Sequence, residues 1–284
     1  MDHDAAPERA LFKAQQTTHW NDVAAGWAAR AEWTERNFAP LTSWLCAAAW
    51  RPGSRVLDLA CGSGYPTIAA AQAVGPTGHV VGADISPEML AAAASRARAV
   101  GLANIEFIEQ DSEALRFDAD SFDAVTHTYG LMFCPNLERA VSEMRRVLRP
   151  GGCAAVVVWD EPQKSPYFDL FFTGGGQLLG LAPPTPGAPG PFRLAAPGTL
   201  AALFQSVGFD DVRVETLAMI FECESVEDYI QMFGDFAFKS RLARLTDADR
   251  VRLRAEVASL VNPYVDDRGH IQLLTTSLCG LGRK

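Results

Sequence analysis

The sequence contains no run of about 20 apolar residues, the length that a helix needs to cross a bilayer. Its first residues, Met1-Asp2-His3-Asp4, are acidic and lack the apolar segment of a signal peptide. We therefore expect a cytoplasmic protein without a membrane span.

Basic residues are also scarce: 25 Lys and Arg stand against 34 Asp and Glu, giving a formal net charge of −9. A protein that binds nucleic acid needs a basic face for the phosphate backbone, so we expect no nucleic-acid partner. The six cysteines are scattered and include no Cys-x-x-Cys pair. Scattered thiols are typical of a reducing compartment, and we expect no metal site.

The chain does contain enough apolar material for a globular core, with 48% hydrophobic and 21% charged residues. Its length of 284 residues leaves one large domain or two small ones open. Strands are predicted from Val56 and at 79–84, 105–109, 122–126 and 153–159, with helices between them, such as 137–148. This alternation is typical of a parallel, doubly wound sheet.

One motif follows the first predicted strand. An apolar run ends in Asp58, a tight turn follows with Gly62 and Gly64, and an alanine-rich helix begins near Thr67. The two glycines have no Cβ, so the backbone can adopt positive φ and a ligand can approach it closely. Twenty residues beyond Gly64, the strand 79–84 ends in Asp84. An acidic group at this distance suits the hydroxyls of a ribose, so the motif predicts an adenosine-bearing ligand.

The third glycine of the dinucleotide fingerprint G-x-G-x-x-G is missing, because Pro66-Thr67 stands in its place. A carboxylate at Asp58 would repel a pyrophosphate and attract an ammonium group. These two features favour S-adenosylmethionine as the cofactor and argue against a dehydrogenase.

Several blocks in order, VLDLACGSGYPTIAAA, VVGADISPEML, EFIEQDSEAL, FDAVTHTYGLMFCPNLERAVSEMRRVLRPGG and GPFRLAAPGTLAALFQSVGFDDVRVE, resemble a class I S-adenosylmethionine-dependent methyltransferase. The resemblance is to the quinone-biosynthesis C-methyltransferase-like group and covers roughly residues 40–222. It implies an α/β fold with a doubly wound, seven-stranded, mostly parallel Rossmann-like sheet. Late strands at 212–221 and 271–278 would join this sheet, the last one antiparallel.

The motif and the resemblance together assign the expected cofactor contacts. Asp58 would hold the amino end and Asp84 the ribose, while Asp111 and Ser112 would read the adenine amino group. The remaining expected contacts are backbone, flanking or lid contacts, made by Ala60, Gly62, Gly64, Ile85, Met89, Trp27 and His127.

Two residues are candidates for the chemistry itself. His127 ends the predicted fourth strand, next to where the resemblance places the transferred methyl group, and the Tyr129 hydroxyl could orient an acceptor. A buried structural histidine remains the alternative for His127. Trp20 and Trp27 either anchor the N-terminal helices or face the sulfonium by cation–π attraction. Arg193 either binds an anionic acceptor or is a solvated loop residue.

We expect four segments: an N-terminal helical lid (1–50), a cofactor-binding α/β core (51–160), an irregular substrate-pocket insert (161–198), and a C-terminal part of the core (199–284) with a helical insert (225–262). The acceptor pocket would be walled by the N-terminal helices, 160–195 and 225–262. The expected reaction is methyl transfer to a small, apolar or aromatic metabolite of natural-product, quinone or terpenoid type. The alternatives are a protein or RNA methyltransferase and a non-catalytic module of the same fold; a monomer and a homodimer both remain open.

Overall fold

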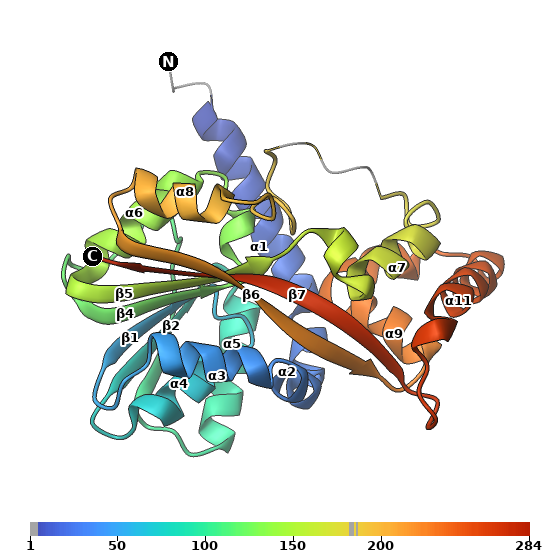
Figure 1. The fold of residues 1–284 in the computed structure, drawn as a ribbon, viewed down its shortest axis with the longest axis horizontal. Helices are drawn as coiled ribbons and strands as arrows, with labels where there is room; N and C mark the ends of the chain where they lie inside the picture. Colours follow the sequence, from blue (N-terminus) through green and yellow to red (C-terminus); the bar gives the residue numbers. More distant parts are fainter. Residues whose placement is uncertain (1–4, 182–184, 186) are drawn as a thin grey trace.

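A single seven-stranded sheet forms the centre of the molecule in the computed structural model, which describes residues 5–181, 185 and 187–284. Its strand order is β3-β2-β1-β4-β5-β7-β6 (Figure 1). The strands are β1 (Arg55–Leu59), β2 (His79–Asp84), β3 (Ile105–Glu109), β4 (Phe122–Thr128), β5 (Leu148–Trp159), β6 (Asp210–Cys223) and β7 (Ile271–Arg283). Pairs within β1–β5 are parallel, whereas β7 runs antiparallel to both β5 and β6. The predicted fold class is confirmed.

Helices cover both faces of this sheet. Helices α3 (Ala39–Ala48) and α4 (Thr67–Val74) lie on one face, and α6 (Leu137–Val147) and α8 (Thr199–Ser206) lie on the other (Figure 1). The central strands are therefore buried on both sides, which explains their continuous apolar sequence; Val156, Val157 and Val158 of β5 have no exposed surface.

Local sequence signals set where these helices begin. Ser86 caps α5 (Pro87–Ala99) by accepting the backbone N–H of Met89 at 3.1 Å. Asn136 caps α6 in the same way, accepting from Arg139 at 3.0 Å. The short hydroxyl or amide side chain supplies an acceptor that the first helical turn otherwise lacks. Several strand boundaries differ from the prediction: β5 already begins at Leu148, directly after α6, and not at Cys153, and β4, β6 and β7 are longer than predicted.

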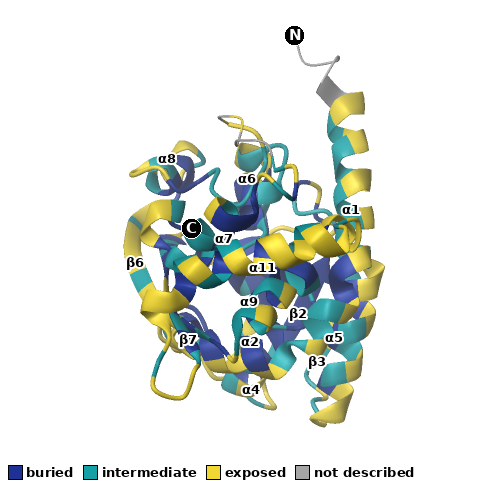
Figure 2. Cartoon of the chain, turned by 90° about the vertical axis from the view of Figure 1, so that its right-hand side faces the viewer, coloured by how far each residue is buried: buried dark blue, intermediate teal, exposed yellow. Residues whose placement is uncertain are grey.

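The amino-terminal segment is helical, as expected, with α1 (Ala5–Ala29) and α2 (Ala31–Asn37) preceding α3. The first turns of α1 extend beyond the body of the molecule (Figures 1 and 2). No helix in the described ranges combines the length and apolarity required to span a bilayer.

The segment 161–198 is more regular than predicted, because it contains a short 3-10 turn, η2 (Pro162–Lys164), and the helix α7 (Pro166–Gly175). Gly174 of this helix lies in tight contact with α11 (Asp247–Val261): a Cβ on Gly174 would lie 3.1 Å from Val257. Helix packing, not a turn, accounts for this glycine. Pro183, Pro184 and Pro186 of the predicted irregular insert lie outside the described residues.

Residues 225–262 are helical as predicted, in the order α9 (Val226–Phe233), the π-helical turn η3 (Gly234–Phe238), α10 (Lys239–Ala243) and α11, followed by η4 (Asn262–Tyr264). Together with α7 they pack at the far end of β6 and β7 (Figure 1). Phe171 of α7 stacks on Phe233 of α9 with ring centroids 3.6 Å apart.

Candidate active site

A cleft that is partly open to solvent lies at the carboxyl ends of β1, β2 and β4. Loops that follow parallel strands converge at this edge, which is the usual ligand position in doubly wound sheets. Most of the residues predicted for the site line the cleft: Trp27, Ala60, Gly62, Asp84, Ile85, Met89, Asp111, Ser112, His127 and Tyr129. Asp58 and Gly64 do not. The sequence thus predicted the location, while each residue's role toward a ligand stays a prediction.

The loop after β1 has the backbone that the glycine motif predicts. Both Gly62 (φ 52°) and Gly64 (φ 96°) adopt positive φ, and Ala60 does so as well (φ 52°). The two glycines differ in their surroundings. A Cβ on Gly62 would meet nothing within 4 Å, whereas one on Gly64 would lie 3.2 Å from Ala93 of α5. Gly62 presents bare backbone to the cleft, and Gly64 instead permits close packing of the loop against α5.

Asp84 joins two loops through its carboxylate. Its Oδ2 accepts the backbone N–H of Gly62 and its Oδ1 that of Ser86, both at 2.9 Å. Burial raises the pKa of Asp84, and these two backbone hydrogen bonds partly oppose the shift. Each carboxylate oxygen has a second lone pair, so the fixed group can still accept hydrogen bonds from a diol.

Asp58 lies beneath the cleft and has no exposed surface. Each oxygen accepts one hydrogen bond, from Thr67 Oγ1 and Thr126 Oγ1, both at 2.6 Å. Burial raises the pKa of Asp58 to about 6, although the threonine hydroxyls pull it down. Asp58 does not line the cleft, and its expected hold on the cofactor's amino end, directly or through water, stays a prediction. Its negative charge can also act on a ligand electrostatically.

The cleft also contains two polar residues that sequence reasoning missed, Lys13 and Gln16 of α1. Lys13 Nζ lies 2.7 Å from Asp111 Oδ2 and 2.6 Å from Glu113 Oε2. Burial lowers the pKa of Lys13, but the hydrogen bonds and charges of the two carboxylates outweigh it and the net shift is upward. No local motif marks these residues, since only the folding of α1 across the sheet brings them to the loop after β3.

The two candidates for the chemistry are poor bases. Burial lowers the pKa of His127 to about 3, so its imidazole is neutral at physiological pH, and neither ring nitrogen has a hydrogen-bond partner among the described residues. Burial raises the pKa of Tyr129 well above its ordinary value, so its hydroxyl stays protonated. The Tyr129 hydroxyl lies 2.8 Å from Ser277 Oγ, and its ring stacks on Trp159 at 3.8 Å. This geometry favours orienting a ligand over moving a proton.

The cleft is also lined by aromatic side chains: Trp20, Trp27, Phe38, Tyr65 and Phe133. Trp20 and Phe133 meet edge to face, with centroids 5.3 Å apart. The Tyr65 hydroxyl donates to the Phe38 carbonyl at 2.8 Å, so its polar atom is already satisfied. These rings suit a flat apolar ligand.

The expected contribution of 160–195 and 225–262 to this pocket is wrong: no residue lining the cleft in the described chain comes from either segment. Their aromatic side chains pack instead on one another, as Tyr167 and Phe233 do with centroids 5.0 Å apart. Arg193 donates to the carbonyls of Cys134 and Pro135. It thereby fixes the loop after β4, and its guanidinium does not line the cleft.

The residues present fit S-adenosylmethionine. The described fold leaves few buried side-chain polar atoms without a partner, and several of them line this cleft: Gln16 Oε1, both His127 ring nitrogens and, beside it, Thr128 Oγ1. Buried polar groups normally have partners, so these atoms indicate a ligand with polar groups. The open backbone at Gly62 and the fixed carboxylate of Asp84 suit an adenosine moiety.

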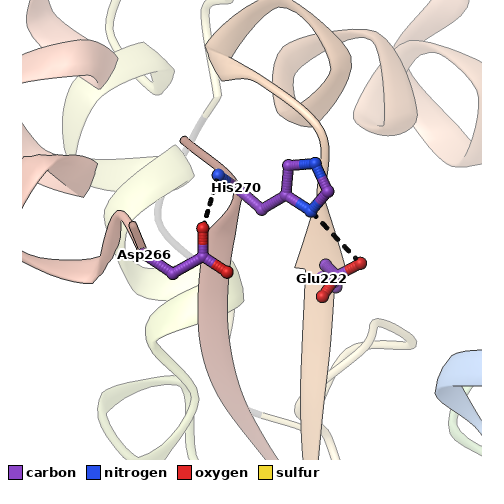
Figure 3. A group of neighbouring side chains, drawn as sticks. All are labelled: Glu222, Asp266 and His270. Carbon is purple, nitrogen blue, oxygen red and sulfur yellow. Dashed lines mark hydrogen bonds and ion pairs between the residues drawn. The ribbon is translucent and has the colours of Figure 1, made fainter. Parts of the chain in front are cut away.

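A separate group of potential metal ligands, Glu222, Asp266 and His270, lies at the end of β6 and the start of β7 (Figure 3). His270 Nδ1 is 3.4 Å from a Glu222 oxygen. Arg268 already pairs with both carboxylates, at 3.1 Å and 3.0 Å. The internal cation compensates the acidic charge, so the group stabilises the connection between the two strands.

Comparison with known proteins agrees with this geometry. Residues 43–173 match the model of the ubiE/COQ5 methyltransferase family. A ubiquinone/menaquinone biosynthesis C-methyltransferase of Ectopseudomonas mendocina is 44% identical over 113 residues, covering 39% of this chain and 44% of that protein. A demethylmenaquinone methyltransferase of Bacillus cytotoxicus is 39% identical over 112 residues, covering 39% of this chain and 47% of that protein. The chain thus spans about half the length of the curated relatives it matches.

A structural neighbour extends the similarity of fold. Phosphoethanolamine N-methyltransferase 2 of Haemonchus contortus, solved with S-adenosyl-L-methionine, covers 88% of this chain and 52% of its own, with a TM-score of 0.53 and 19% identity. At this identity the likeness concerns the fold alone. The family match and the relatives agree with the resemblance that the sequence motifs predicted: residues 43–173 are similar to methyltransferases of the ubiE/COQ5 type, and the fold is that of a solved S-adenosylmethionine-dependent methyltransferase.

Proposed function

We propose that this protein transfers a methyl group from S-adenosylmethionine to a small, apolar, aromatic acceptor of quinone type. The observation that carries the proposal is the mixed lining of one cleft. Carboxylates and open backbone line it together with several aromatic rings. The names of the relatives, which are quinone-biosynthesis methyltransferases, support a quinone-type acceptor among the natural-product, quinone and terpenoid classes.

The polar residues of the cleft would bind the cofactor. Asp84 would accept the ribose hydroxyls, Asp111 and Ser112 the adenine amino group, and the backbone at Gly62 would lie against the ligand. When bound, the cofactor supplies an electrophilic methyl group on a sulfonium. The negative charge of Asp58 beneath the floor favours a cationic ligand above it.

The aromatic residues of the cleft would hold the acceptor in line with the methyl group. Orientation and exclusion of water can lower the barrier by roughly 7–11 kcal/mol in well-aligned systems. A ring carbon that gains the methyl group would also have to lose its proton, which would pass to water because neutral His127 and protonated Tyr129 are weak bases. Neutral His127 can donate or accept a hydrogen bond in the cleft. The Tyr129 hydroxyl, held by Ser277, can do the same. We propose positioning roles for both.

The alternative functions receive less support. A protein or RNA methyltransferase needs an open, basic rim, whereas α1 crosses this cleft and the net charge is −9. A non-catalytic module would not need to keep Asp84, Gly62 and Asp111 together.

The roles of 1–50 as lid and of 51–160 and 199–284 as core are part of the proposal. A small-molecule acceptor, the absence of a nucleic-acid partner, a cytoplasmic location and a monomeric or homodimeric state stay predictions.

Calorimetric titration with S-adenosylmethionine tests the first half of the proposal, and saturable binding is expected. The second half is tested by incubating the protein with radiolabelled S-adenosylmethionine and a reduced 2-alkyl-1,4-naphthoquinone. Label should appear on the ring carbon, and the Asp84→Ala variant should yield none. Absence of binding at millimolar cofactor would contradict the proposal, and binding without transfer to any quinol would restrict it to the cofactor.

A further inference from the structure

Helix α1 crosses the cleft with one face. Lys13, Gln16, Trp20 and Trp27 all line it, and their spacing places them along one side of the helix. Lys13 pairs with Asp111 in the loop that is expected to read adenine, and Trp20 contacts Phe133 in the loop after β4. A single helix therefore contacts the loops after β3 and β4 that line the cleft.

The carboxyl-terminal end of α1 is firmly attached. Arg30, directly after it, pairs with Asp228 at 2.6 Å and Asp235 at 2.7 Å. Trp27 Nε1 donates to the Phe236 carbonyl at 3.1 Å. These contacts join α1 to α9 and η3. The three partners, Asp228, Asp235 and Phe236, do not line the cleft.

The middle of α1 packs on a small apolar cluster that is separate from the main core. It consists of Val23, Ala24 and Met89, with Trp20 and Trp27 against it. Met89 also lines the cleft, so the packing of α1 is continuous with the ligand site. One polar contact supports it, between Asn21 Oδ1 and Ser86 Oγ at 2.6 Å.

Toward its amino end, α1 is held by Lys13. Figure 2 shows α1 along one side of the molecule, with its first turns extending past the body. Lys13 is bound at once to Asp111 and Glu113. The side chain of Glu113 is only 5% exposed, and its other oxygen accepts the Asn136 backbone N–H at 2.7 Å. Removing Lys13 would leave a buried carboxylate oxygen unpaired.

We propose that Lys13 is a positioning residue that fastens α1 over the cofactor and thereby sets how long the cofactor or its demethylated product stays bound. This inference rests on the proposed function. The same ion-pair contact orders the Asp111–Glu113 loop and holds the helix against it, so release of both carboxylates by Lys13 would loosen α1 and let the ligand's adenosine end leave faster. Lys13 acts on binding and release, not on the transferred methyl group.

The test uses S-adenosylhomocysteine as the probe with the full-length protein. For Lys13→Met we expect about tenfold weaker calorimetric binding, carried mainly by faster dissociation in stopped-flow tryptophan fluorescence. Lys13→Arg should restore most of the affinity, because it keeps the charge. The matched control is Lys239→Met, which breaks the 3.0 Å ion pair between Lys239 and Asp22 of α1 outside the cleft and should bind like the wild type.

Hydrogen exchange on the wild type gives a second readout that does not depend on a variant folding. Amides of residues 8–20 should become more protected when S-adenosylhomocysteine binds, and Lys13→Met should lose that protection. Unchanged protection, or equal affinity of Lys13→Met and wild type, would overturn the role of Lys13 while leaving the proposed function intact. Failure of the wild type to bind S-adenosylhomocysteine would overturn both.

Discussion

The carboxylate of Asp84, at the end of β2, accepts a hydrogen bond from the backbone N–H of Gly62 in the loop after β1, with an O–N distance of 2.9 Å. The second oxygen of Asp84 accepts the Ser86 N–H at the start of α5. The carboxylate therefore sets the relative position of the two loops that form the floor of the cleft. A ligand bridging them would meet a site that is already ordered.

Replacing Asp84 by Ala should remove this arrangement and weaken S-adenosylhomocysteine binding at least about tenfold, because hydrogen bonds to a charged group are lost. Isothermal titration measures the change. Asp267→Ala, at an exposed aspartate outside the cleft, is the matched control and should leave affinity unchanged. Equal affinities of Asp84→Ala and wild type would refute a ribose-binding role.

Much of the fold was predictable because its signals are local. Ser86 and Pro87 mark a helix start, and the valines of β5 form an apolar run long enough for a buried strand. The interior of 161–198 was not predictable in the same way. There Gly174 lies within a helix. Its neighbours, which are distant in sequence, leave no room for a side chain at this position. Only tertiary packing distinguishes such a glycine from a turn.

In the candidate site, too, only residues with local sequence signals could be predicted. Asp84 and Gly62 follow directly from strand ends and spacing, so they could be predicted from the sequence. Lys13 could not, because its partners Asp111 and Glu113 lie about a hundred residues away and nothing in its surroundings marks it. The prediction that 160–195 walls the acceptor pocket was wrong because it relied on composition. The aromatic residues of α7 would suit a pocket, but they face the core.

The buried carboxylate of Asp58 should make stability depend on pH. Its pKa is raised from 3.8 to about 6 in the folded state, so between these values the folded protein binds more protons than the unfolded chain. The contribution of Asp58 is therefore fully present below about pH 4 and is lost as pH rises through about 6, by roughly 3 kcal/mol at most.

Comparison of wild type with Asp58→Asn by urea unfolding between about pH 4 and pH 7 isolates this effect. The wild type should lose stability relative to the variant as pH rises. A difference in free energy of unfolding that does not vary with pH would show that the carboxylate titrates normally. Thr67 and Thr126 can still bond to the Asn oxygen or amide, so the variant is expected to fold.

His127 should remain neutral throughout the physiological range. Burial lowers its pKa to about 3, so the ¹³Cε1–H signal of His127, assigned with His127→Gln, should not move between about pH 5 and pH 8. The folded state also resists protonation, so the contribution of His127 to stability is present above its unfolded pKa of 6.5 and is lost as pH falls below it. A titration midpoint near neutrality would instead support a role as general base.

Gly130 lines the cleft and has no room for a side chain. A Cβ at this position would lie 2.3 Å from the Cβ of Ala60 and 2.6 Å from Cε1 of His127, so Gly130→Ala must displace the loop after β1 or the imidazole. We expect a loss of about 1–3 kcal/mol in stability together with weaker S-adenosylhomocysteine binding. Gly190→Ala is the control, since its added Cβ would meet nothing within 4 Å and the backbone φ is not positive. Thermal unfolding and calorimetry on both variants measure the two effects. If Gly130→Ala matched Gly190→Ala in both, the close approach of Gly130 to Ala60 and His127 would have no part in shaping the cleft.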